Sequence, residues 1–316
     1  MEEENLMKKF VAVILALVMC LSLFTVGVAE SAVRDYNFVF IVKSMQFSFM
    51  LSMIDGAEAA ASLVDNINLV CQGPETPYSV SEQIELVEQA ITNGVDAIMI
   101  TPADSTGIIP AIEAANAAGI PIATPNTKAY GGDVLTWIGV DNYTVGYQLG
   151  KAICDALNGE GKVVLIEGTA GNSTSTERVD GYLDAFAEYP GITLLDSQPA
   201  DFNREMGMTV MENFLERYDN IDGVASVNKD MTMGALEAVK AADRQDEMIQ
   251  VTFDVDNDTL DAIEAGEILI TGAQEEKSQV ANAIYACLLA CNGFKVAPEQ
   301  YIPMTLVTAE NVALYR

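Results

Sequence analysis

Residues 95–124 read VDAIMITPADSTGIIPAIEAANAAGIPIAT, and this stretch decides the fold. Its first part, VDAIMIT at 95–101, is apolar on successive residues rather than on alternate ones. A helical apolar pattern follows over 108–118 and stops before Gly119, and IPIAT at 120–124 forms a second apolar run. Continuous apolar runs are typical of parallel strands that are covered by helices on both faces. The stretch therefore predicts a strand, a helix and a second parallel strand.

The same alternation extends along the rest of the chain. The further predicted strands lie at 38–42, 67–70, 162–167, 193–195, 223–227, 249–253 and 268–271, and the further predicted helices at 47–64, 81–92, 174–187, 203–217, 231–242 and 257–265. The chain has 316 residues, more than the roughly 250–300 at which a single core tends to split. We therefore predict the α/β class, with two doubly wound parallel-sheet lobes of the Rossmann-like kind.

Composition and charge exclude several classes of function. The chain has 16 basic and 46 acidic residues, a formal charge of −30, so it cannot gain free energy by releasing counterions from nucleic acid. It contains no histidine, which excludes serine–histidine triads and histidine-ligated metals. We therefore expect no nucleic-acid partner, no metal and no cofactor.

The N-terminus predicts export. Lys8 and Lys9 precede an apolar run over 10–28, and small residues follow it, as in a secretory signal peptide over residues 1–29. Two other readings stay open, a single membrane anchor and lipid attachment at Cys20. Translation could also start at Met7 rather than Met1. Each reading places the mature chain in the periplasm or at the outer face of the cell membrane.

Ligands of open parallel sheets bind at the carboxyl ends of the strands, and these positions carry a distinctive set of residues. They are aromatic, amide and hydroxyl side chains with a few carboxylates, found at 43–49, 102–105, 125–127, 168–175, 197–202, 228–230, 254 and 274. Aromatic rings pack on the C–H faces of sugars, while amides and carboxylates bind hydroxyl groups. The set favours a neutral, polyhydroxylated ligand, and no nucleophile stands beside an obvious base.

A family resemblance rests on motifs spread over the whole chain from about residue 34. They are TPADS at 101–105, AANAAGIPI at 114–122, Asp141-Asn142, GTAG at 168–171, Glu177-Arg178, SQPADF at 197–202, MGAL at 233–236 and Phe253-Asp254. With these motifs the chain resembles periplasmic sugar-binding proteins of the ribose-binding type, from ABC import systems. The resemblance implies a type I periplasmic-binding fold with a three-stranded hinge. It implies a first lobe of 34–140 plus 274–303 and a second of 141–273 plus 304–316.

The resemblance also implies which residues hold the ligand. Phe49, Phe202, Asn228, Asp254 and Gln274 match residues that contact ribose in the family. Other positions depart from the pattern. Phe47 stands where an Asn is usual, Asn126 and Thr127 replace an Asp-Arg pair, and Thr176 stands for a second sugar-binding Arg. Two missing guanidiniums favour a larger, less polar or deoxygenated sugar, or a polyol, over ribose. Trp137 is either a core residue or a stacking platform.

The resemblance implies a monomeric solute receptor without catalysis. Its partners would be a small sugar or polyol and an ABC permease in the membrane. A membrane sensor or chemoreceptor could take the place of the permease. A secreted carbohydrate-active enzyme is the alternative from another class, and it would use paired carboxylates such as Asp230 and Asp254.

Overall fold

A computed structural model describes residues 34–316 of the chain. The predicted signal peptide and the candidate lipidation site at Cys20 lie outside the described residues. Within residues 34–316, no helix has the length and apolarity needed to cross a membrane.

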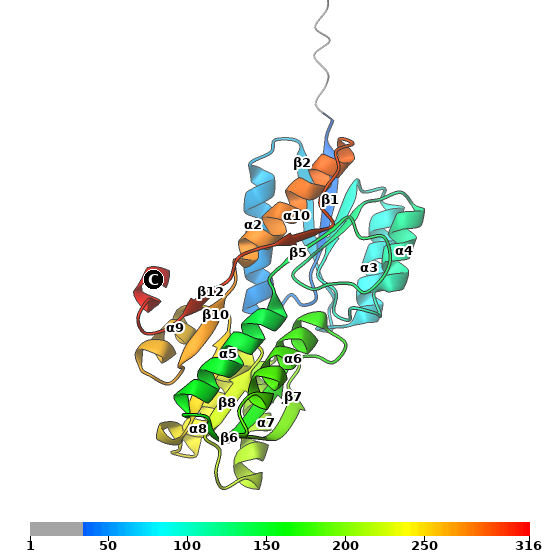
Figure 1. Ribbon diagram of the computed structural model, residues 1–316. Helices are drawn as coiled ribbons and strands as arrows, with labels where there is room; N and C mark the ends of the chain where they lie inside the picture. Colours follow the sequence, from blue (N-terminus) through cyan, green and yellow to red (C-terminus); the bar gives the residue numbers. More distant parts are fainter. Residues whose placement is uncertain (1–33) are drawn as a thin grey trace, which may run out of the picture. The chain divides into compact units, whose positions relative to one another are not determined.

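The first lobe is built on a six-stranded sheet. Its order is β11-β5-β4-β3-β1-β2, and every neighbouring pair is parallel. The strands are β1 (Tyr36–Ile41), β2 (Ile67–Gln72), β3 (Ala97–Ile100), β4 (Ile122–Pro125), β5 (Thr136–Gly139) and β11 (Glu299–Tyr301). Helices α2 (Ser48–Ser62) and α10 (Glu276–Cys291) cover one face, and α3 (Val80–Thr92) and α4 (Ile109–Ala117) cover the other (Figure 1). The predicted parallel arrangement is therefore confirmed for this lobe.

The second lobe repeats the plan. Its sheet has the order β12-β10-β9-β8-β6-β7 and is parallel except for the antiparallel pair of β10 and β12. The strands are β6 (Glu160–Glu167), β7 (Gly191–Pro199), β8 (Gly223–Ser226), β9 (Ile249–Phe253), β10 (Ile270–Ala273) and β12 (Thr305–Val307). The helices are α5 (Asn142–Ala156), α6 (Ser173–Ala187), α7 (Arg204–Arg217), α8 (Lys229–Ala241) and the short α9 (Asn257–Glu264), with single 3₁₀ turns at Gln245–Glu247 and Val312–Tyr315.

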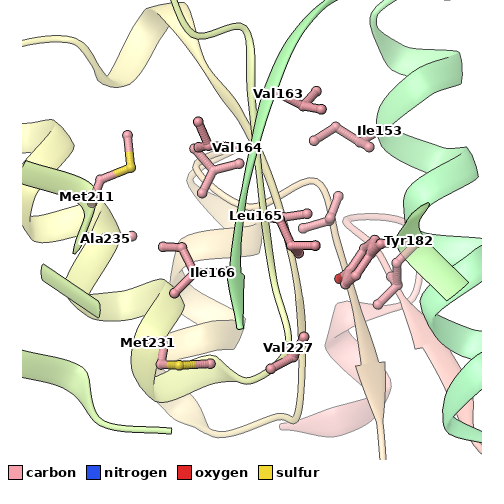
Figure 2. Close-up of a cluster of buried hydrophobic side chains, with 14 of the residues drawn as sticks. Ile153, Val163, Val164, Leu165, Ile166, Tyr182, Met211, Val227, Met231 and Ala235 are labelled. Atoms are coloured by element: carbon pink, nitrogen blue, oxygen red, sulfur yellow. The ribbon is translucent and has the colours of Figure 1, made fainter. Parts of the chain in front are cut away.

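Strand β6 shows why the strands are apolar on every residue. Val163 and Leu165 point toward the side of α5 and α6, where Ile153 lies, whereas Val164 and Ile166 point toward α7 and α8 (Figure 2). All four strand side chains are fully buried. Successive side chains of a strand point to opposite faces, so a sheet covered on both faces needs an apolar residue at each position.

The chain passes between the two sheets three times. The crossings follow β5, β10 and β11, and they lead into α5, α10 and β12. These three segments form the hinge of the type I periplasmic-binding architecture, which confirms the predicted fold class. Strands β5, β11 and β12 were not among the predicted elements, because each contains a polar residue and none is a continuous apolar run.

Candidate functional site

A cavity lies where the carboxyl ends of strands from both sheets meet. Its lining combines aromatic rings, amides, hydroxyls and four charged groups. The lining residues are Lys43, Phe47, Phe49, Met50, Tyr78, Asn126, Thr174, Arg178, Phe202, Asn228, Asp230, Asp254 and Gln274. The cavity is thus in the position that the topology of an open parallel sheet favours for a ligand.

Seven of the ten predicted ligand-binding residues line this cavity. They are Phe47, Phe49, Asn126, Phe202, Asn228, Asp254 and Gln274. The structure brings these residues together from segments that lie more than 200 positions apart in the sequence.

The other three predicted residues do not line the cavity. Thr127 lies behind it, and its hydroxyl oxygen accepts a hydrogen bond of 2.8 Å from Lys43 Nζ. The Thr176 hydroxyl is turned back into the first turn of α6 and donates to the carbonyl of Asn172. Trp137 is buried in β5, where its Nε1 donates to the carbonyl of Asn126. The placement of Trp137 agrees with the core role among its two readings.

Six lining residues were not among the predicted ligand-binding residues. Lys43, Thr174 and Asp230 lie at the strand-end positions identified in the sequence, whereas Met50, Tyr78 and Arg178 lie outside them. Arg178 supplies a guanidinium that was not among the predicted ligand-binding residues. It lines the cavity two positions after Thr176, whereas position 176 itself carries no arginine. Residues two positions apart in an α-helix point to nearly opposite sides. Arg178 therefore lines the cavity, whereas the Thr176 hydroxyl bonds within α6. Tyr78 comes from the loop before α3, where no periodic pattern could identify it.

Three aromatic rings form a stack across the cavity. Tyr78 lies between the other two, with its ring centroid 5.7 Å from that of Phe47 and 5.9 Å from that of Phe202. The rings of Tyr78 and Phe202 are stacked at 19°. Phe47 and Tyr78 belong to the first lobe, and Phe202 belongs to the second, so the stack joins the two lobes. Such rings can pack on the C–H face of a sugar.

Strained backbone is concentrated at the cavity. Seven non-glycine residues among those described have a positive φ between 50° and 73°. Four of them line the cavity, with φ values of 62° at Tyr78, 67° at Asn126, 55° at Phe202 and 73° at Asp254. Left-handed backbone costs about 1–2 kcal/mol for most residues with a side chain and less for Asn and Asp, so Tyr78 and Phe202 carry most of the strain. Such strain collects at functional sites, which indicates that these two rings are held in place for a purpose other than stability.

A chain of amide side chains connects the two halves of the cavity wall. Asn126 Nδ2 donates to Gln279 Oε1 at 3.4 Å, Gln279 Nε2 donates to Gln274 Oε1 at 3.4 Å, and Gln274 Nε2 donates to Asp254 Oδ1 at 2.5 Å. Gln279 is fully buried on α10 and does not line the cavity. The chain therefore fixes the orientation of three lining groups, and Gln279 is a supporting residue that sequence reasoning missed.

Asn228 and Asp254 present opposite hydrogen-bonding groups. Asn228 is the N-cap of α8, and its Oδ1 accepts from the backbone N–H of Met231. Its amide NH₂ is left as the group that can donate to a ligand. Burial raises the pKa of Asp254, while Arg178 and the hydrogen bond from Gln274 oppose that shift. One donor and one acceptor on neighbouring strand ends are suited to a ligand hydroxyl, which both donates and accepts.

Two buried cations face the cavity. Lys43 is 3% exposed, and its Nζ lies 5.5 Å from the centre of the Phe202 ring. Burial, followed by repulsion from Arg178, lowers the pKa of Lys43 to about 7, although Asp254 acts against the shift. Arg178 is 1% exposed, and burial lowers its pKa to about 10. Arg178 Nε donates to Asn142 Oδ1, and Nη1 donates to the carbonyl of Val227.

The two lobes touch each other beside the cavity. Lys229 Nζ donates to Ser48 Oγ at 2.8 Å, and Asn172 Nδ2 donates to the carbonyls of Pro102 and Ala103. An ion pair of 3.4 Å joins Lys128 of the first lobe to Glu177 of the second. The structure is therefore of a closed arrangement, in which groups of both lobes surround one space.

Both carboxylates of the lining are engaged by neighbouring side chains. Of the two lining carboxylates, Asp254 accepts from Gln274 and Asp230 is paired with Lys229 at 3.5 Å. Within residues 34–316, no group of three or more Cys, Asp or Glu side chains could hold a metal ion.

Known proteins share both the sequence pattern and the fold. The profile of a family described as "Periplasmic binding protein domain" matches residues 38–295. A ribose import binding protein of Bacillus subtilis is 31% identical over 275 residues, which cover 87% of this chain and 88% of that protein.

Two solved structures are similar over almost the whole described chain. An ABC transporter periplasmic solute-binding protein from Actinobacillus succinogenes, with bound D-allose, has a TM-score of 0.84 at 31% identity and covers 89% of this chain and 100% of its own. A solute-binding protein from Bacillus halodurans, with bound myo-inositol, has a TM-score of 0.85 at 28% identity and covers 89% and 97%. The resemblance to ribose-type sugar-binding proteins is thereby confirmed.

Proposed function

The chain belongs to the periplasmic binding protein family, and on this premise we propose that it is an extracytoplasmic solute receptor of an ABC importer. It would capture a monosaccharide or a related polyol between its two lobes and deliver it, chemically unchanged, to a membrane permease. We propose that it acts as a monomer and has no nucleic-acid partner.

One observation carries the proposal. Aromatic rings and hydrogen-bonding amides from both lobes converge on a single cavity, and four of its residues hold left-handed backbone to do so. The bound D-allose and myo-inositol of the two similar structures are polyhydroxylated molecules of the kind that such a lining fits. Relatives in this family are named binding proteins, which supports a role without catalysis.

The mechanism follows from the division of the lining between lobes. We propose that the first lobe comprises 34–140 plus 274–303 and the second 141–273 plus 304–316. A ligand would contact Phe47 and Asn126 on one side and Phe202 and Asn228 on the other only when the lobes are closed. A ligand shifts such an equilibrium by no more than its differential affinity for the two states. The closed form would be the one that the permease recognises.

A thermal-shift screen tests the proposal. Purified mature protein is heated with pentoses, hexoses, deoxysugars, polyols and sugar acids, each at several millimolar. A ligand present at about 100 times its dissociation constant adds about 2.7 kcal/mol of stability, which raises the melting temperature by several degrees. We expect at least one member of the panel to do so.

Two outcomes would contradict the proposal. The first is a melting temperature that no hydroxylated compound moves. The second is sustained release of monosaccharide from disaccharides, because Asp230 and Asp254 would then be acting as an enzyme's paired carboxylates.

A further inference from the structure

Two buried cations line the cavity without forming an ion pair with its carboxylates. Lys43 and Arg178 both line it, and neither belongs to an ion pair within the described chain, although the neighbouring Lys229 pairs with Asp230 and Asp256. Lys43 Nζ donates only to the neutral oxygens of Thr127 and Asn126, at 2.8 and 3.4 Å. A buried charge without a partner is costly, so two such charges at one cavity need an explanation.

Arg178 also has a hydrogen-bond donor without an acceptor. Its Nε and Nη1 are bonded, and its guanidinium carbon lies 3.9 Å from the centre of the Phe253 ring. Its Nη2 is buried and has no partner. Most buried polar atoms are hydrogen-bonded, and an unmade bond to a charged group costs more than most. Because Arg178 lines the cavity, a ligand is the natural source of the missing acceptor.

The nearby carboxylates form no ion pair with either cation. Asp254 acts electrostatically on both Lys43 and Arg178, but its hydrogen bond is with Gln274. Glu177 also acts on Arg178, but it forms its own ion pair with Lys128. Asp230 and Asp256 both pair with Lys229, and the contact of Asp256 is the shorter of the two.

We infer that the ligand of this site carries one carboxylate, and that Lys43 and Arg178 Nη2 bind it. The inference rests on the proposed function and narrows it to monosaccharide acids, such as uronic or aldonic acids. Asn228, Asp254 and the three rings would hold the hydroxyl-bearing part. The lining already contains the carboxylates of Asp230 and Asp254, so a singly charged carboxylate meets less repulsion there than a phosphate group, which carries between one and two negative charges at neutral pH.

Binding of such an acid would depend on pH through Lys43. Arg178 and Asp254 are the charged groups that act on its amine, and Asp230 and Tyr78 are the other titratable groups of the lining. The amine donates to Asn126 and Thr127 and lies over the Phe202 ring, and Arg178 retains its proton at neutral pH. A free Lys43 with a pKa of about 7 must gain a proton to bind an anion strongly. The affinity should therefore be highest below pH 7 and fall by up to about tenfold per pH unit above it.

Matched ligand pairs provide the test. We would measure dissociation constants by calorimetry at pH 6 and pH 8.5 for D-glucuronate against D-glucose, D-galacturonate against D-galactose, and D-ribonate against ribitol. We expect an acid to bind at least tenfold more tightly than its neutral partner at pH 6, with the advantage reduced at pH 8.5. In the Lys43→Met variant the advantage should fall at least tenfold. The Lys295→Met variant, which removes an exposed lysine outside the cavity, should keep it.

The results separate this inference from the proposed function. Neutral sugars that bind as tightly as their acids, or a phosphorylated sugar that binds more tightly than any acid, would overturn the inference and leave the receptor function standing. An acid preference that Lys43→Met does not reduce, in a variant that melts cooperatively, would also overturn it. Failure of every compound to bind would overturn both.

Discussion

Replacing Asp254 by Asn should weaken ligand binding without weakening the fold. Asp254 has a φ of 73°, and Asn is one of the few residues that tolerates left-handed backbone. The Asn side chain has nearly the same shape, and its carbonyl oxygen can still accept the 2.5 Å hydrogen bond from Gln274. Only the negative charge and one acceptor are lost.

The size of the expected loss in ligand affinity follows from the burial of this carboxylate. A hydrogen bond to a charged group contributes about 1.5–3 kcal/mol, which corresponds to a dissociation constant roughly 10- to 150-fold higher. Stability should respond in the opposite sense. Because burial raises the pKa of Asp254, its charge is a cost to the folded state, so the Asn variant should be at least as stable as the natural protein.

Isothermal titration calorimetry with a ligand from the thermal screen measures the loss, and urea unfolding measures the stability. Asp243→Asn is the matched control, since Asp243 also has a positive φ of 56° but is exposed outside the cavity. The control should bind like the natural protein. A dissociation constant for Asp254→Asn within threefold of the natural value would refute the reasoning and remove Asp254 from the site.

Three further predictions concern single side chains. The stability of the natural protein relative to Lys43→Met, measured by urea unfolding without ligand, should increase as the pH rises from about 7 to 10.5. The increase is at most about 1.4 kcal/mol per pH unit, because the unfolded chain holds the lysine proton more tightly than the folded chain does. A difference in stability that stays constant with pH would contradict the lowered pKa of Lys43. Phe202→Leu removes the ring that stacks on Tyr78, so titration should give an affinity roughly tenfold lower, and an unchanged affinity would exclude stacking. Glu177→Gln breaks the ion pair with Lys128 between the lobes. The ligand affinity should fall by up to about fivefold at low salt and by less at high salt. A loss of affinity that does not depend on salt would count against an electrostatic contact.

Most of the fold could be predicted because its signals are local. The continuous apolar run in β6 and the helix that ends before Gly119 are visible in the sequence, and they correspond to elements of the structure. Strands β5, β11 and β12 could not be predicted in this way. None of them is a continuous apolar run, and β11 pairs with a strand far away in the sequence, with Glu299 opposite Trp137.

The site was predicted less completely than the fold. Positions that directly follow a strand, such as Asn126 and Asp254, could be identified because the ends of parallel strands gather at one edge. Tyr78 could not, since it enters the cavity from a loop whose backbone is held by a hydrogen bond to Lys43, far back in the sequence. Choosing between Thr176 and Arg178 required the direction in which each side chain leaves α6, and only one of the two lines the cavity.

The sequence by itself determined the α/β class, the parallel sheets and the polar chemistry at the strand ends, because hydrophobic periodicity and turn residues act over a few neighbouring positions. Only the tertiary structure decided that Lys43 and Arg178 share one cavity and that neither has a carboxylate partner there. Burial and electrostatic interaction depend on distances in space, and the two residues are 135 positions apart in the chain.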